Sequence, residues 1–90
     1  MLNKDYLLDC KILHEIRGRI RIKSRALKYL GIHKEDITKQ LMQVHYIQSV
    51  EISSITGTIL VYFDNFSLTG ENLISLLQNT LNTYLVDIYK

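Results

Sequence analysis

This 90-residue sequence has one cysteine, little net charge and no long hydrophobic run. The single cysteine, Cys10, cannot form an internal disulfide, which is consistent with a reducing compartment. No apolar stretch approaches the roughly 18 residues that a membrane span requires, and the N-terminal residues lack the order of a secretory signal. We therefore expect a cytoplasmic protein without a membrane span. The net charge of +2 does not by itself indicate a partner.

Sequence motifs for enzyme chemistry are also missing. There is no glycine-rich phosphate loop, no nucleophile elbow and no carboxylate pair with a neighbouring base. Glu35 and Asp36 stand where a helix is expected to begin, and Asp64 stands where a hairpin is expected to end. We therefore expect a non-enzymatic protein, with residues 1–90 forming one domain around a single core.

The first half of the chain predicts a strand and then a helix. Apolar side chains occupy most even positions from Cys10 to Lys23, which predicts a long half-buried strand. A bulge at Gly18 would split this strand into two pieces. The connection through residues 24–31 has room for one helical turn, and apolar residues at helical spacing predict a helix within residues 33–46.

The second half predicts a hairpin, a helix and a closing strand. Within residues 47–64, apolar and polar side chains alternate on both sides of Thr56 and Gly57, which supply the turn. Leucines at four-residue intervals predict a helix within residues 67–84, with Thr69 as its N-cap. Residues 85–89 have the pattern of a short strand. This order predicts a ferredoxin-like βαββαβ sandwich of the α+β class, a four-stranded antiparallel sheet with two helices on one face. The residues expected in its core are Ile20, Ile22, Ile37, Leu41, Val50, Ile52, Ile59, Val61, Phe63, Leu73 and Leu77.

Cations occupy every second position from Arg17 to Arg25. If Ile20 and Ile22 face the helices, the alternate residues must project from the open face of the sheet, on a strand that is central in this topology. The residues that we expect there are Arg19, Arg21 and Lys23 from this strand, Leu60 and Tyr62 from the third strand, and Leu85, Asp87 and Tyr89 from the closing strand. The open face is therefore predicted to be basic and aromatic, with Lys23, Tyr62 and Tyr89 as interaction residues.

Three interpretations of this face compete. It is a solvated surface on which Glu51 and Asp87 partly neutralise the cations, or it docks onto an acidic protein surface or a second copy of the chain. The third interpretation is nucleic-acid binding, because arginines and tyrosines on a four-stranded sheet bind and stack bases. The third strand lacks the basic, glycine and aromatic pattern of RNA-recognition modules, which disfavours this interpretation.

Soft and imidazole metal donors are few and widely spaced. In a regular strand Cys10 and His14 share a face but lie roughly 13 Å apart, whereas zinc bonds are about 2.0–2.3 Å long. His33 and His45 lie at opposite ends of a helix, on the order of 18 Å apart. Spacing therefore predicts no metal site. His14 is a hydrogen-bonded structural residue, an axial ligand to haem, or one donor in a metal site that a second chain completes.

Several short motifs resemble a known family. They are a histidine, a Gly-Arg-x-Arg strand and a Thr-Gly hairpin, and the matching residues are His14, Gly18, Arg19, Arg21, Val50, Thr56, Gly57, Val61, Phe63 and Asp64. Over about residues 10–83 the chain resembles heavy-metal-associated-like domains that lack the metal-binding cysteine pair. Arg17 stands where that family has proline.

The resemblance implies a fold related to copper chaperones and to the N-terminal domains of heavy-metal-transporting P-type ATPases. In the metal-carrying relatives the loop after the first strand holds Cys-x-x-Cys, and here this loop has no cysteine. The resemblance implies a binding module in metal or haem homeostasis, or a docking partner of a transporter. Its candidate ligand-binding residues are His14, Arg17, Arg19 and Arg21, with haem as a candidate cofactor. The alternative is an RNA- or DNA-binding module.

Overall fold

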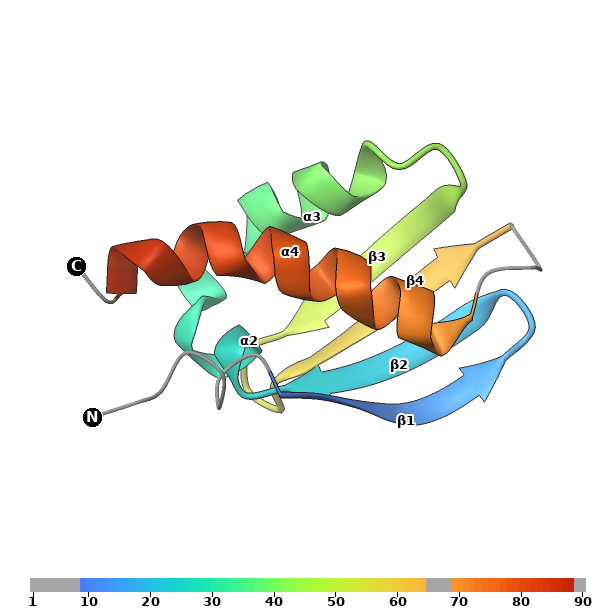
Figure 1. Cartoon of the computed structure of the whole chain (residues 1–90), viewed down its shortest axis with the longest axis horizontal. Coiled ribbons are helices and arrows are strands. Elements are labelled where there is room, and N and C mark those ends of the chain that lie inside the picture. Colours follow the sequence, from blue (N-terminus) through green and yellow to red (C-terminus); the bar gives the residue numbers. More distant parts are fainter. Residues whose placement is uncertain (1–8, 65–68, 89–90) are drawn as a thin grey trace.

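The computed structural model describes residues 9–64 and 69–88, and for residues 85–88 it describes the backbone alone. The elements in chain order are β1 (Cys10–Ile16), β2 (Arg19–Ser24), α2 (Ala26–Tyr29), the 3₁₀ helix η1 (Gly31–His33), α3 (Lys34–Met42), β3 (Ile47–Ser53), β4 (Thr58–Phe63) and α4 (Gly70–Ile88). The strands form one antiparallel sheet in the order β1-β2-β4-β3. Helices α3 and α4 cover the same face of this sheet (Figure 1). The predicted ferredoxin-like α+β arrangement is confirmed.

The first two strands, β1 and β2, form a hairpin. Ile16 of β1 lies opposite Arg19 of β2, so that Arg17 and Gly18 alone form the turn. Gly18 has a φ angle of 83°, a left-handed conformation that glycine adopts without steric cost. The sequence correctly predicts that the segment divides at Gly18, but the cause is a turn between two paired strands and not a bulge.

The predicted closing strand at residues 85–89 is wrong. Helix α4 continues through this segment to Ile88, and Tyr89 lies outside the described residues. The edge position beside β2, which a closing strand would have taken, is occupied by β1. No glycine or proline interrupts residues 71–88, so the sequence contains no signal that would end the helix earlier. Among the described residues, the sheet therefore has four strands and none of them is C-terminal to α4.

The core lies between the sheet and the two long helices. Ile20 and Ile22 of β2 are fully buried, and they belong to one cluster with Ile37 of α3 and Leu77 of α4. All of the predicted core residues are buried except Val50, which is half-buried at the edge of the cluster. Because side chains alternate along a strand, burial of Ile20 and Ile22 directs their neighbours on β2 to the opposite face.

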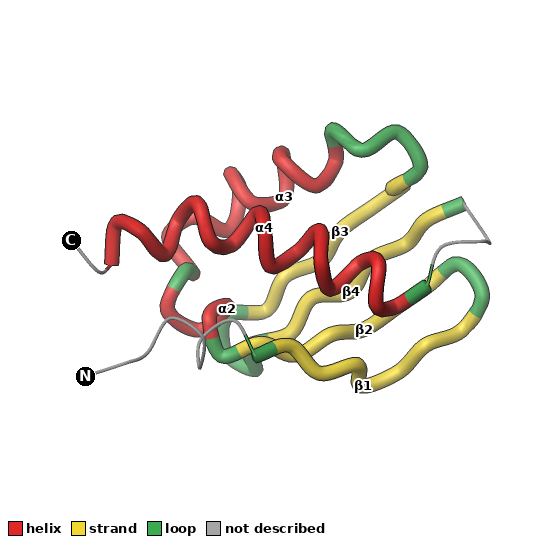
Figure 2. The backbone as a smooth tube through the Cα atoms, in the orientation of Figure 1, coloured by secondary structure: helices red, strands yellow, loops and turns green. Residues whose placement is uncertain are grey.

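Helix α4 begins at a reciprocal cap. Thr69 Oγ1 accepts a hydrogen bond from the Asn72 backbone N at 3.3 Å, and Asn72 Oδ1 accepts one from the Thr69 backbone N at 3.2 Å. The predicted N-cap at Thr69 is confirmed. From this start α4 runs obliquely across the sheet on the side of α3 (Figure 2). The other face of the sheet has no helix over it among the described residues.

Candidate functional site

A bulge in β1 places His14 on the open face. Ile12 lies opposite Ile22 and His14 lies opposite Arg21, so that Leu13 is an extra residue between the two pairs. Side chains at even positions face the helices before the bulge and face away from them after it. Cys10 therefore packs against the core, whereas His14 does not. The expectation that Cys10 and His14 share a face is wrong, because it assumed a regular strand.

Strand β2 presents its cations at the centre of the open face. Because Ile20 and Ile22 are fully buried, Arg19, Arg21 and Lys23 point away from the helices. Arg21 and Lys23 are exposed, and Arg19 is half-buried. Strand β2 lies between β1 and β4, so this row of cations is central in the sheet, as the sequence predicts.

The neighbouring strands add apolar surface to these cations. On β4, Tyr62 lies opposite Arg19 and Leu60 lies opposite Arg21, and both side chains are half-buried. On β1, Ile16 also lies opposite Arg19, and it is 46% exposed. Cations interleaved with accessible apolar groups make a surface on which a ligand or a partner can gain both charge pairing and apolar burial.

One hollow of about 220 Å³ in the open face brings predicted site residues together. It is lined by His14, Arg19, Arg21 and Leu60. The strand register explains why these side chains lie together, because His14 and Leu60 are the partners of Arg21 on the two neighbouring strands. Arg17 belongs to the turn between β1 and β2 and does not line the hollow. Leu60 is absent from the predicted ligand-binding set, although the alternation of its strand places it on this face.

The expected contribution of a closing strand to the open face does not exist. Leu85 and Asp87 belong to α4, which covers the opposite face, and Tyr89 lies outside the described residues. Glu51 of β3 does lie on the open face, because its register partner is Leu60. It also lines a shallow hollow together with Arg21. One of the two predicted neutralising carboxylates is therefore found beside the cations.

Metal-ligating side chains are scattered over the described part of the chain. Among them, no three histidine, cysteine, aspartate or glutamate side chains gather closely enough to hold a metal. Burial raises the pKa of the Cys10 thiol, the nearby Asp9 charge raises it as well, and a hydrogen bond with Ser24 acts in the opposite direction. Because soft metals bind the thiolate, a raised pKa disfavours Cys10 as a ligand. In the loop that the resemblance compares with the Cys-x-x-Cys loop of metal carriers, Ala26–Tyr29 form α2 and Gly31–His33 form η1.

The other two histidines make aromatic contacts away from the hollow. The His33 ring lies 4.9 Å from the ring of Tyr84, measured between centroids. The His45 ring lies 5.4 Å from the ring of Tyr46 in an edge-on arrangement. His14 is the histidine that lines this hollow together with Arg19 and Arg21.

Comparison with known proteins connects the chain to a family. The family model described as heavy metal associated domain 2 matches residues 6–84. The match includes all four strands and every residue that lines the hollow at His14. No curated protein and no solved structure matches the chain. None of the helices in the described part of the chain is long and apolar enough to cross a membrane.

Proposed function

This chain belongs to the heavy metal associated domain 2 family, and from that membership we propose that it is a non-enzymatic binding module of metal or haem homeostasis. Its working surface is the open face of the sheet. The observation that supports this most directly is the hollow in which His14 lies with Arg19 and Arg21. The described residues offer no group of three or more donors for a bare ion. The hollow is therefore better suited to a ligand that takes one donor from the protein and carries negative charge for the arginines.

Haem meets that requirement. His14 is exposed, so its imidazole can reach a ligand that arrives from solution. Arg19 and Arg21 line the same hollow, and guanidinium groups form strong paired hydrogen bonds with carboxylates. Haem carries an iron that accepts an axial imidazole, and it also carries two propionate groups. His14 would hold the iron and the arginines would hold the propionates, while the bound haem would supply the iron chemistry.

A haem titration followed by absorbance tests this proposal. We expect a saturable Soret shift that is lost in His14→Ala and kept in His33→Ala and His45→Ala, the matched controls away from the hollow. Arg19→Gln and Arg21→Gln should weaken binding without moving the Soret maximum, because they change the propionate partners and not the axial ligand. Equal spectra for all three histidine variants would remove His14 from the site.

The same face supports a second function, which is docking onto an acidic protein surface. Leu13 and Ile16 are 45% and 46% exposed, and Arg21 and Lys23 are exposed beside them. Apolar side chains among cations favour a partner that is acidic and partly apolar. We propose a transporter or a second copy of this chain as that partner. Sedimentation velocity at two protein concentrations tests the second copy, and a monomer at both concentrations would exclude it.

A further inference from the structure

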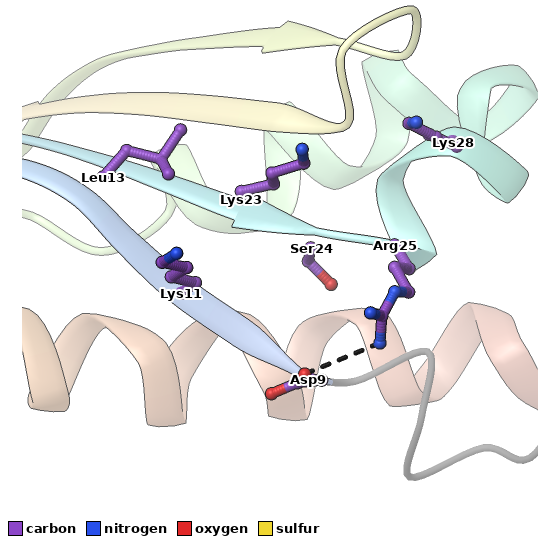
Figure 3. Close-up of a pocket in the computed structure, with 7 residues that line it drawn as sticks. All are labelled: Asp9, Lys11, Leu13, Lys23, Ser24, Arg25 and Lys28. Atoms are coloured by element: carbon purple, nitrogen blue, oxygen red, sulfur yellow. Dashed lines mark ion pairs between the residues drawn. The ribbon is translucent and has the colours of Figure 1, made fainter.

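A second basic site lies where the end of β2 leads into α2. Figure 3 shows this pocket, which has a volume of about 370 Å³. The charged side chains that line it are Asp9, Lys11, Lys23, Arg25 and Lys28. Four cations and one carboxylate give the pocket an excess of three positive charges. The hollow at His14 has different lining residues.

Two of these cations face each other in the sheet. Lys11 of β1 is the direct register partner of Lys23 of β2, and both side chains are exposed. Like charges directly opposite each other destabilise an antiparallel pair. Neither lysine forms an ion pair with any residue that the structure describes, whereas Arg25 pairs with Asp9 at 3.6 Å. An anion bound between the two lysines would relieve their repulsion.

The turn between β3 and β4 positions a third lysine. A Cβ atom on Gly57 would lie 3.1 Å from Lys28 Cγ, which shows that the Lys28 stem lies across this turn. The Ser24 backbone N donates a hydrogen bond to the Gly57 carbonyl at 2.9 Å, so the end of β2 is joined to the same turn. In Figure 3, Lys23 and Lys28 lie on one side of the pocket. The pair of Asp9 and Arg25 lies on the other side, so the carboxylate is already engaged by a cation.

We propose that this pocket binds a phosphate group that carries at least two negative charges, through Lys11, Lys23 and Lys28. A carboxylate would neutralise only one of the three excess charges, whereas a phosphomonoester or diphosphate carries more charge and several acceptor oxygens. Ammonium groups bind phosphate as point charges and need no fixed two-pronged geometry. The pocket is distinct from the proposed haem site, because it uses neither His14 nor its neighbouring arginines, although Leu13 and Lys23 also belong to the surface proposed for docking.

A phosphorylated small molecule and an acidic lipid headgroup share this chemistry. Two exposed isoleucines make it possible to distinguish between them by experiment. Ile32 in η1 is 90% exposed, and Ile55 in the turn after β3 is 88% exposed. Their segments adjoin, because a Cβ atom on Gly31 would lie 3.1 Å from Ser54 Cβ. A lipid headgroup would bring acyl chains to this end of the molecule, where the isoleucines can insert. A soluble ligand would leave both isoleucines in water.

Calorimetric titration with pyrophosphate in a phosphate-free buffer tests the pocket. We expect saturable binding that weakens about tenfold in Lys23→Gln and in Lys28→Gln, since each removes a charged hydrogen-bond donor. Lys39→Gln, a matched change at an exposed lysine of α3 outside the pocket, should leave the affinity unchanged. His14→Ala should also leave it unchanged, so that failure of the haem proposal and failure of this one are distinguishable.

Cosedimentation with phosphatidylcholine vesicles, with and without phosphatidic acid, identifies the source of the phosphate. Pyrophosphate binding without vesicle binding supports a soluble ligand. Binding to the phosphatidic acid vesicles that is lost in the Ile32→Ser and Ile55→Ser double variant supports a lipid headgroup. The proposal is overturned by the absence of both kinds of binding, by equal weakening in Lys39→Gln, or by polyglutamate binding as tightly as pyrophosphate. Circular dichroism of each variant establishes that it is folded.

Discussion

Glu15 Oε2 accepts a hydrogen bond from the Gly70 backbone N at 3.3 Å, which joins β1 to the first turn of α4 across 55 residues of sequence. Glu15 can reach the helix because the bulge at Leu13 turns it to the side of Ile20, its register partner. The same bulge turns His14 to the open face. One extra residue in an edge strand therefore anchors a helix on one side of the sheet and completes a candidate ligand site on the other.

The first prediction concerns this anchor. We expect Glu15→Ala to lower the free energy of unfolding by about 1 kcal/mol, because it removes a hydrogen bond and a negative charge at a helix N-terminus. Glu15→Gln keeps an acceptor oxygen and should lose about half as much. Urea denaturation measures both changes. Glu51→Ala, on the open face, serves as the control, and an equal loss in that variant would show that the Gly70 contact is not the cause.

The second prediction concerns the turn between β3 and β4. Gly57 has a φ angle of 69°, and an added Cβ atom would lie 3.1 Å from the Ser24 carbonyl oxygen. Gly57→Ala should therefore lower the free energy of unfolding by roughly 1–2 kcal/mol. Ile55→Ala in the same turn removes an exposed side chain and should change it by less than about 0.5 kcal/mol. Thermal and urea denaturation measure both changes. An equal loss of stability in the two variants would contradict this explanation.

The third prediction concerns the pH dependence of stability. Burial raises the pKa of Cys10, so the folded chain keeps the thiol proton at pH values where the unfolded chain has lost it. The stability linked to this proton is present below the ordinary thiol pKa of about 8.5, and it is lost as the pH rises through the higher folded value. We expect the free energy of unfolding to fall more steeply above about pH 9 in the wild type than in Cys10→Ala. Parallel curves would show that Cys10 does not contribute.

The fourth prediction separates protein docking from nucleic-acid binding at the open face. If the face binds nucleic acid, the slope of log affinity against log salt should fall by about two in the Arg19→Ala and Arg21→Ala double variant. If it docks a protein through apolar anchors, binding should survive moderate salt, and Tyr62→Ala should cost more than either arginine change. We expect the docking result. Tight binding of a fluorescent single-stranded oligonucleotide at physiological salt would instead establish the alternative.

The local pattern of the chain was enough to predict the centre of the sheet. The alternation of Ile20 and Ile22 with cations required one buried face and one open face, because successive side chains of a strand point to opposite sides. Thr56 and Gly57 marked the second hairpin, and Thr69 marked the start of α4, because their conformational preferences act over a few neighbouring residues. These features depend on short-range geometry, so the sequence by itself determined them.

Only the tertiary structure decided what occupies the edge of the sheet and which way His14 points. Residues 85–88 can extend a helix or form a strand, and the position beside β2 admits one strand. The N-terminal segment takes that position through a turn at Arg17 and Gly18, so β1 pairs with its immediate neighbour along the chain. The bulge at Leu13 depends on how β1 pairs with β2. A shift of one residue in that pairing turns every later side chain of the strand to the opposite face. Alternation within a single strand carries no signal for that shift.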